Sequence, residues 1–178
     1  MMQKSFLTNE RIYLRAVEPE DLEVFYRMEN DPAFWEISSF TVPYSRYVLT
    51  QYIENSANDM FADKQLCLMI ARHSDHKVLG TIDITDFVPL HSRAAVGIAL
   101  LEEYRGNGYA KDALSLLCDY ALGFLQMKQL YAHIPTDNKA SLELFKHCGF
   151  QTCGIMKDWL KAGNGFKDVV MVQYFSEK

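Results

Sequence analysis

The residues best suited to do chemistry lie in a glycine-containing turn, which reads Glu102-Glu103-Tyr104-Arg105-Gly106-Asn107-Gly108-Tyr109-Ala110. An apolar run precedes this turn and a long amphipathic stretch follows it. Glycines let backbone N–H groups converge, and the positive end of the following helix dipole would lie behind them. Such a turn can hold a pyrophosphate, and Arg105 and Lys111 would add local positive charge. An ordinary tight connection between a strand and a helix remains the alternative for this turn taken alone.

Two other phosphate-binding patterns are excluded by spacing. The dinucleotide-binding pattern GxGxxG requires a third glycine or an alanine where Lys111 stands, and the Walker pattern requires Gly-Lys followed by Ser or Thr. A second segment begins about thirty residues after the turn. Asn138 opens a helical stretch that ends at Gly149-Phe150, directly after an apolar run.

Together these two segments resemble the GNAT superfamily of acyl-CoA-dependent N-acetyltransferases. The pyrophosphate motif of that family is matched by Arg105, Gly108 and Ala110. Its second motif, Asn-x-x-Ala ahead of Gly-Phe, is matched by Asn138, Ser141 in place of Ala, Gly149 and Phe150. The resemblance covers nearly the whole chain and is to the ribosomal-protein N-terminal and polyamine acetyltransferase branch.

The resemblance implies contacts to acetyl-CoA, which would be a co-substrate, and no metal. In the family, the strand before the turn splays from its neighbour and pairs with the pantetheine arm; those positions are Ile98, Ala99 and Leu100. The amides of the turn would bind the pyrophosphate, and the Asn138 side chain and the Phe145 position would line the donor site. The implied pyrophosphate-binding residues are Arg105, Gly106, Asn107, Gly108, Tyr109 and Ala110.

Attack on the thioester requires a neutral amine, so a general base helps. Alignment with the family places Asp83 and Asp86 on the strand beside the thioester or just past its end. Alternation puts Asp83 and Thr85 on one face and Asp86 on the other, unless a bulge intervenes. We place Asp86 nearer the cleft, although alternation does not show which face looks inward. The alternative is that both are solvent-facing strand carboxylates.

One position departs from the family. Many members carry a Tyr on the second helix that protonates the departing thiolate, and this chain has Phe145 there. Phenylalanine donates no proton. Ser141 one turn earlier, His147 or water would have to replace it, or the thiolate leaves unassisted.

Strands and helices are mixed along the chain, which predicts an α/β fold with a mainly antiparallel twisted sheet and helices on both faces. This is the GNAT acyl-CoA N-acyltransferase fold. Strands are expected at 12–16, 65–72, 78–87, 93–101, 130–134, 152–160 and 168–175, and helices at 18–30, 45–56, 108–126 and 138–148. An aromatic loop at 34–44 would form one wall of the acceptor site.

Composition sets the broad class of the protein. The chain has 178 residues, of which 49% are hydrophobic and 23% charged, and this predicts one globular domain over 1–178. Its net charge of -5 argues against a nucleic-acid partner and is compatible with a cationic one. The four cysteines form no CxxC pair, and neither a signal sequence nor a membrane span is recognisable, so a cytoplasmic location without a membrane partner is expected.

The predicted function is transfer of an acetyl group from acetyl-CoA to a primary amine. The acceptor would be a polyamine, another small amine or a protein N-terminal α-amine. The acids Glu29, Asp31 and Glu36 near the early loop favour a cationic small amine. The alternative is a non-catalytic module that binds acyl-CoA and senses it, suggested by Phe145. Members of this branch often form homodimers, and a homodimer is the partner expectation carried over from them.

Overall fold

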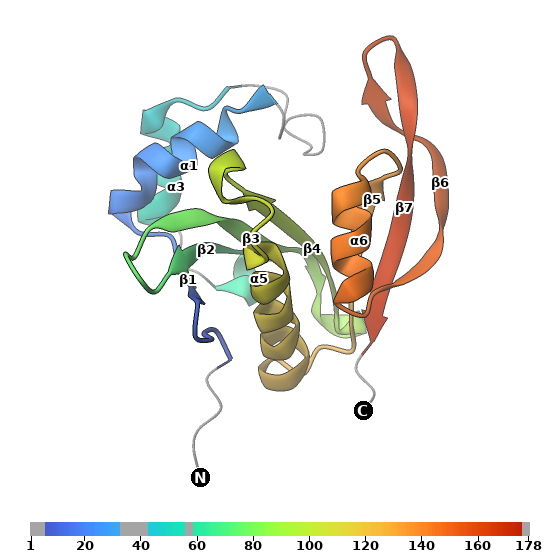
Figure 1. Cartoon of the computed structure of the whole chain (residues 1–178), viewed down its shortest axis with the longest axis horizontal. Coiled ribbons are helices and arrows are strands. Elements are labelled where there is room, and N and C mark those ends of the chain that lie inside the picture. The colour runs from blue at the N-terminus through green and yellow to red at the C-terminus, as the bar shows by residue number, and fades with distance from the viewer. Residues whose placement is uncertain (1–5, 33–42, 56–58, 176–178) are drawn as a thin grey trace.

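In a computed structural model, described for residues 6–32, 43–55 and 59–175, the chain forms one seven-stranded sheet (Figure 1). The strand order is β1-β2-β3-β4-β5-β7-β6, and each adjacent pair is antiparallel except β4 and β5. The strands are β1 Ile12–Ala16, β2 Leu66–Arg72, β3 Val78–Val88, β4 Arg93–Leu100, β5 Gln129–Pro135, β6 Gln151–Ala162 and β7 Gly165–Phe175. The predicted mixed, mainly antiparallel sheet is confirmed.

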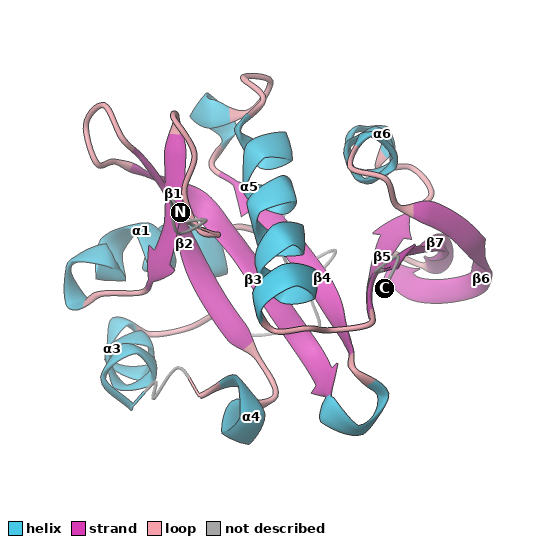
Figure 2. Cartoon of the chain, turned by 90° about the horizontal axis from the view of Figure 1, so that it is seen from below, coloured by secondary structure: helices cyan, strands magenta, loops and turns pink. Residues whose placement is uncertain are grey.

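Helices cover both faces of the sheet, with α5 and α6 on one side and α1 and α3 on the other (Figure 2). The helices are α1 Leu22–Glu29, α3 Arg46–Asn55, α4 Met60–Asp63, α5 Tyr109–Cys118 and α6 Lys139–His147. Alternation along the strands supplies both faces. Leu68, Ile82 and Val96 pack in the core that α5 covers, whereas Cys67 packs against the helical residues Phe25 and Leu49. Within the described ranges, none of the helices combines the length and apolar content needed to cross a membrane.

The long helix predicted over 108–126 is α-helical only to Cys118. It continues as a π-helix over Asp119–Phe124, in which the Leu125 N–H donates to the Tyr120 carbonyl at 3.0 Å. Ala121 remains buried in this wider turn. The apolar periodicity therefore continues through the segment, and a pattern of period 3.6 does not distinguish the two helix types.

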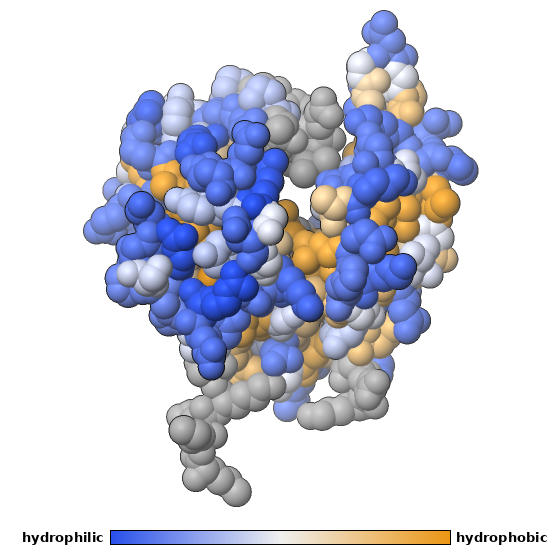
Figure 3. All heavy atoms as spheres, viewed as in Figure 1, coloured by the Kyte–Doolittle hydropathy of each residue, from blue (hydrophilic) through white to orange (hydrophobic). Residues whose placement is uncertain are grey.

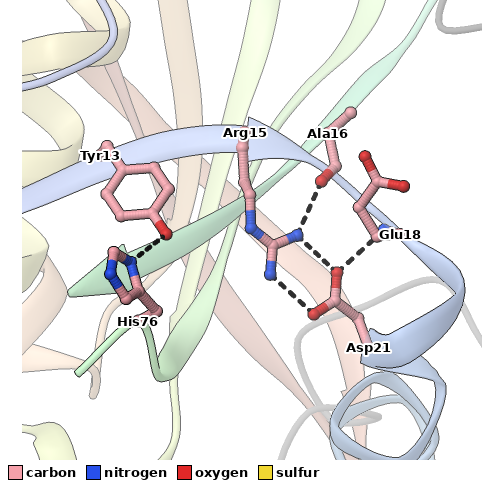
Figure 4. Close-up of polar contacts among 6 residues, drawn as sticks. All are labelled: Tyr13, Arg15, Ala16, Glu18, Asp21 and His76. Atoms are coloured by element: carbon pink, nitrogen blue, oxygen red, sulfur yellow. Dashed lines mark hydrogen bonds and ion pairs between the residues drawn. The ribbon is translucent and has the colours of Figure 1, made fainter. Parts of the chain in front are cut away.

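A partly buried ion pair joins β1 to Asp21, the N-cap residue of α1 (Figure 4). The Arg15 guanidinium donates to both carboxylate oxygens of Asp21, at 2.6 and 2.8 Å, and Asp21 also accepts the Glu18 N–H at 2.9 Å. Asp21 is buried at 4% exposure, so its two charge-assisted partners offset its desolvation. This contact fixes the start of α1, whose other end carries Glu29.

The sheet opens between β4 and β5. Only three residue pairs join these parallel strands: Arg93 with Gln129, Ala94 with Leu130, and Ala95 with Tyr131. Beyond Ala95 the strands separate, as the resemblance implied (Figure 1). The Leu101 N–H donates to the Leu79 carbonyl of β3, and backbone groups alternate in direction along a strand. The backbone of Ile98 and Leu100 therefore faces the gap, whereas that of Ala99 faces β3.

Candidate active site

The start of α5 has the geometry of an anion site. Gly106 and Gly108 have φ values of 76° and 82°, in the left-handed region where glycine is favoured. Gly108 is the N-cap of α5, and no side chain among the described residues caps its first turn. The residues from Arg105 to Gly108 are exposed. The Arg105 N–H donates to the Glu102 carbonyl at 3.2 Å, so the amides that remain for a ligand begin at Gly106. An exposed glycine turn in front of a ten-residue helix is the arrangement that binds phosphate groups.

Arg11 brings a positive charge to this turn from the segment just before β1. Its Nη2 donates to the Asn107 carbonyl at 2.6 Å, its Nη1 lies 3.1 Å from the Asp112 carboxylate, and its guanidinium stacks 4.6 Å from the Tyr109 ring centroid. Sequence reasoning missed Arg11 because it lies nearly one hundred residues from the turn that it contacts. The antiparallel order of the sheet and the position of α5 beside β1 bring them together.

From the sequence we expect Arg105 to add positive charge at the turn. In the structure its side chain is also hydrogen-bonded to the end of β4. Its Nε donates to the Leu100 carbonyl at 3.0 Å, at the end of β4. Because that carbonyl faces the gap, one of the backbone groups predicted to pair with pantetheine already has a partner. Ile98 is then the β4 residue whose backbone best fits the predicted pantetheine contact.

The second motif forms the start of α6. The Asn138 side chain accepts the Ser141 N–H at 3.1 Å and so caps the helix. Ser141 is half-buried, and the exposed His147 has its Nδ1 2.6 Å from the Glu143 carbonyl oxygen. A donor contact by Asn138 and proton donation by Ser141 stay predictions.

Phe145 lies in the core rather than on a cleft surface. It is 3% exposed, its ring meets Phe150 edge-on at 4.9 Å, and Phe150 in turn stacks on Tyr174. This position fills the space between α6 and the β5–β7 half of the sheet. The contact of the Phe145 position with the donor stays a prediction.

On the opposite face of the sheet, three residues form a row across β2, β3 and β4. Cys67 pairs with Asp83, and Asp83 pairs with Gly97. Burial raises the pKa of Asp83 to about 6, against a smaller opposite effect of the neighbouring Cys67 thiol. A carboxylate with this pKa is ionised at neutral pH and is still basic enough to accept a proton.

Glu29, at the end of α1, faces the same region. Burial, and secondarily the charge of Asp83, raises the pKa of Glu29 to about 7. Burial also raises the pKa of the neighbouring Tyr52. Electrostatic interactions with Cys67 and Asp83 raise it further. Because burial and the charge of Asp83 hold Glu29 partly protonated, a nearby positive charge favours its ionised form, and a bound ammonium group supplies such a charge.

Asp86, the carboxylate that we placed nearer the cleft, lies in a bulge. The pairing of β3 with β4 shifts between Thr85 and Val88, and Asp86 is exposed with a φ of 49°. The bulge that the alternation argument left open is therefore present. Asp83 is the residue in register with the open part of β4. Which of the two is the base stays a prediction, and this geometry favours Asp83.

Sequence reasoning also missed His133. It was counted within an apolar strand, but Leu130, Ala132 and Ile134 face the α5 core, whereas His133 is exposed on the other face. Its ring lies 6.2 Å from that of Trp159, and burial lowers its pKa against an opposite effect of Asp86. The alternation of apolar and polar residues in β5 was the signal that could have identified it.

On the α5 side, the space-filling view shows a hollow between the two halves of the molecule, with an apolar floor (Figure 3). It lies between α5 and α6, where the splay of β4 from β5 separates the halves. An open strand edge, an uncapped helix start and an apolar cleft thus lie together.

Comparison with known proteins identifies this arrangement. Residues 11–151 match the model of the acetyltransferase (GNAT) domain. The chain belongs to the GNAT family. It is therefore an acetyltransferase with acetyl-CoA as co-substrate, and N-acetyltransferase relatives along most of the chain confirm an enzyme rather than a sensing module.

Three similar proteins illustrate the range of this GNAT relationship. A spermidine N(1)-acetyltransferase of Vibrio cholerae is 21% identical over 173 residues, covering 96% of each chain. An uncharacterized N-acetyltransferase, p20, of Bacillus licheniformis is 28% identical over 167 residues, covering 93% of each. The crystal structure of the Vibrio cholerae spermidine N-acetyltransferase in complex with CoA and spermine superposes with a TM-score of 0.82 at 21% identity, covering 94% of this chain and 96% of that one.

Proposed function

We propose that this GNAT enzyme acetylates a primary amine of a linear polyamine such as spermidine. The observation that carries the proposal is the placement of Glu29 and Asp83 together on the face of the sheet opposite α5, beside the splayed strand. A polyamine is cationic along its length, so it would restore the ionised form of both acids. The spermidine acetyltransferases among the relatives support the same acceptor class.

The proposed reaction needs few protein groups. The acceptor binds as an ammonium ion, and Asp83 takes one proton from it. The neutral nitrogen then attacks the thioester carbon, so that an N–C bond forms and the C–S bond breaks. The oxyanion that develops meets a backbone N–H of β4, and its collapse expels the thiolate. The thiolate takes a proton from Ser141 or water, which recovers one from the attacking nitrogen, so that a neutral amide and a neutral thiol result.

We further propose that Ile98 aligns the pantetheine arm and that the amides from Gly106 to Ala110 bind the pyrophosphate. The open backbone of Ile98 and the left-handed glycines support these roles. We also propose a cytoplasmic homodimer. All four cysteines are free thiols, which suits a reducing compartment, and the edge strand β6 is exposed along nearly its whole length.

An acceptor panel tests the proposed function. Release of the CoA thiol is measured with spermidine, with N-terminally free peptides and with amino sugars at equal concentration. We expect kcat/KM for spermidine to exceed that for the other classes by at least about tenfold, which corresponds to about 1.4 kcal/mol of acceptor discrimination. A preference for peptide α-amines would overturn the polyamine assignment while leaving the acetyltransfer intact.

The variant Glu29→Gln tests whether the ionised Glu29 carboxylate lowers the free energy of unfolding. Because burial raises its pKa to about 7, Glu29 destabilises the fold once ionised, and this cost develops as the pH rises from about 4.5 to about 7. We expect the variant to gain about 1 kcal/mol in the free energy of unfolding at pH 8, after allowance for solvent screening, and little at pH 4.5. Urea titrations at both pH values measure the difference.

The control for this prediction is Glu23→Gln on the same helix. Glu23 is exposed, and its hydrogen bond to Arg46 lowers its pKa, so the neutral variant should lose stability at pH 8 rather than gain it. Equal stability changes in the two variants would contradict the account of Glu29.

A further inference from the structure

Gly97 is a glycine that the fold does not require. It lies in the interior of β4 and is exposed, and a Cβ built on it meets no described atom within 4 Å. Its φ is outside the left-handed region, so its backbone suits any residue. Glycine inside a strand weakens the strand, because it loses more conformational freedom on folding and packs no side chain. Packing and backbone geometry therefore leave this glycine unexplained.

Its position relates it to the reaction. Gly97 is directly opposite Asp83 on β3, and both are on the face that α1 and α3 cover. Its neighbours on that face, Ala95 and Ala99, are also small. The splay from β5 begins just after Ala95, so the side of Gly97 away from Asp83 faces the gap. If the pairing with β5 continued for two more residues, His133 would lie opposite Gly97.

The open volume above Gly97 thus has Asp83 on one side and the parted strand β5 on the other. The next residue, Ile98, directs its backbone into the gap where the pantetheine arm is proposed to lie. A thioester aligned there would have its carbonyl carbon near a group that occupied the volume above Gly97. Any side chain at this position would stand between the acid and the thioester.

We propose that Gly97 sets acceptor access: the volume above its Cα, which no described atom fills within 4 Å of a built Cβ, is the passage through which the amine reaches the thioester beside Asp83. This deepens the proposed function, on which it rests for the existence of an amine acceptor. It assigns the glycine to substrate entry rather than to folding or to donor binding.

The test is Gly97→Val, because a β-branched side chain suits a strand and fills the passage. We expect kcat/KM for spermidine to fall about 100-fold, since the amine is displaced from the thioester, while the Kd for acetyl-CoA stays within about twofold. Gly97→Ala, which adds one methyl group, should have a kcat/KM for spermidine between those of the wild type and Gly97→Val. Thermal unfolding should show both variants at least as stable as the wild type.

The matched control is Gly154→Val on the edge strand β6. Gly154 is also an exposed strand glycine outside the left-handed region, and a Cβ there likewise meets no described atom within 4 Å. This variant should share any change in stability and keep wild-type kinetics. An equal loss of activity in the control would show that valine in an exposed strand has a general effect on activity, and would overturn the proposal.

Two further outcomes separate this inference from the proposed function. The same variants are assayed with hydroxylamine, a small neutral nucleophile. If the wild type acetylates hydroxylamine but not spermidine, the polyamine proposal fails. The role of Gly97 is then tested by the decrease in kcat/KM for hydroxylamine in Gly97→Val. Wild-type kcat/KM in Gly97→Val, or a weakened acetyl-CoA Kd parallel to the loss, overturns the role of Gly97 itself.

Discussion

Replacing Gly108 by Glu is expected to raise the Kd for acetyl-CoA about 100-fold or more, a loss of about 2.7 kcal/mol. Two effects combine in this variant. A carboxylate would stand at the positive end of α5, where the pyrophosphate is proposed to bind, and would repel it. In addition, Gly108 has a φ of 82°, which an L side chain adopts only with strain. Isothermal titration with acetyl-CoA measures the change.

Strain alone has to be separated from loss of the anion site. Gly163, in the turn between β6 and β7, also has a positive φ, of 56°. A Cβ built on Gly163 meets no described atom within 4 Å, whereas one built on Gly108 lies 3.3 Å from Arg11 Nη1. Gly163→Glu should therefore carry a similar backbone cost while leaving the Kd unchanged. If both variants weaken acetyl-CoA binding equally, or neither does, the start of α5 is not the pyrophosphate site.

The second large effect is expected for Asp83→Asn, which keeps the shape of the side chain and removes its basicity. Loss of a general base reduces kcat/KM by about 10²- to 10⁴-fold. Since the pKa of Asp83 is raised to about 6, wild-type kcat/KM should climb with pH through this value as the base becomes ionised. The variant should lack that ascending limb and retain the wild-type Kd for acetyl-CoA.

Asp86→Asn is the matched comparison, because the sequence offers both carboxylates and we placed Asp86 nearer the cleft from the sequence. Asp86 is exposed in its bulge, and its neutralisation should change kcat/KM less than tenfold. A large loss in Asp86→Asn with a normal pH profile in Asp83→Asn would reverse the assignment.

The sequence predicted most of the fold because its local signals agree with its packing. The strand expected at 78–87 is β3, Val78–Val88, and the helix expected at 138–148 is α6, Lys139–His147. The turn at Gly108 was identifiable because a positive φ value favours glycine. The π-helix was not, since a widened turn keeps the same buried face.

The site was less predictable because it depends on contacts across the sheet. Alternation placed Asp83 and Asp86 on opposite faces but did not show which face carries the acceptor. Only the register of β2, β3 and β4 puts Asp83 beside Gly97. Phe145 was assigned by a motif position, and the packing of its ring depends on Phe150 and Tyr174, which no local pattern reports. Part of the aromatic loop predicted at 34–44, including Glu36, lies outside the described residues.

The narrow connection between β4 and β5 has a mechanical consequence. Three residue pairs form the only ladder across the middle of the sheet in the described chain, so the two halves share few main-chain hydrogen bonds. A pantetheine arm bound in the opening would form hydrogen bonds with the strand backbone where the two strands form none with each other. Acetyl-CoA would then hold the two halves of the sheet together as well as supply the acetyl group. After CoA leaves at the end of each turnover, the connection between β4 and β5 would again be more flexible.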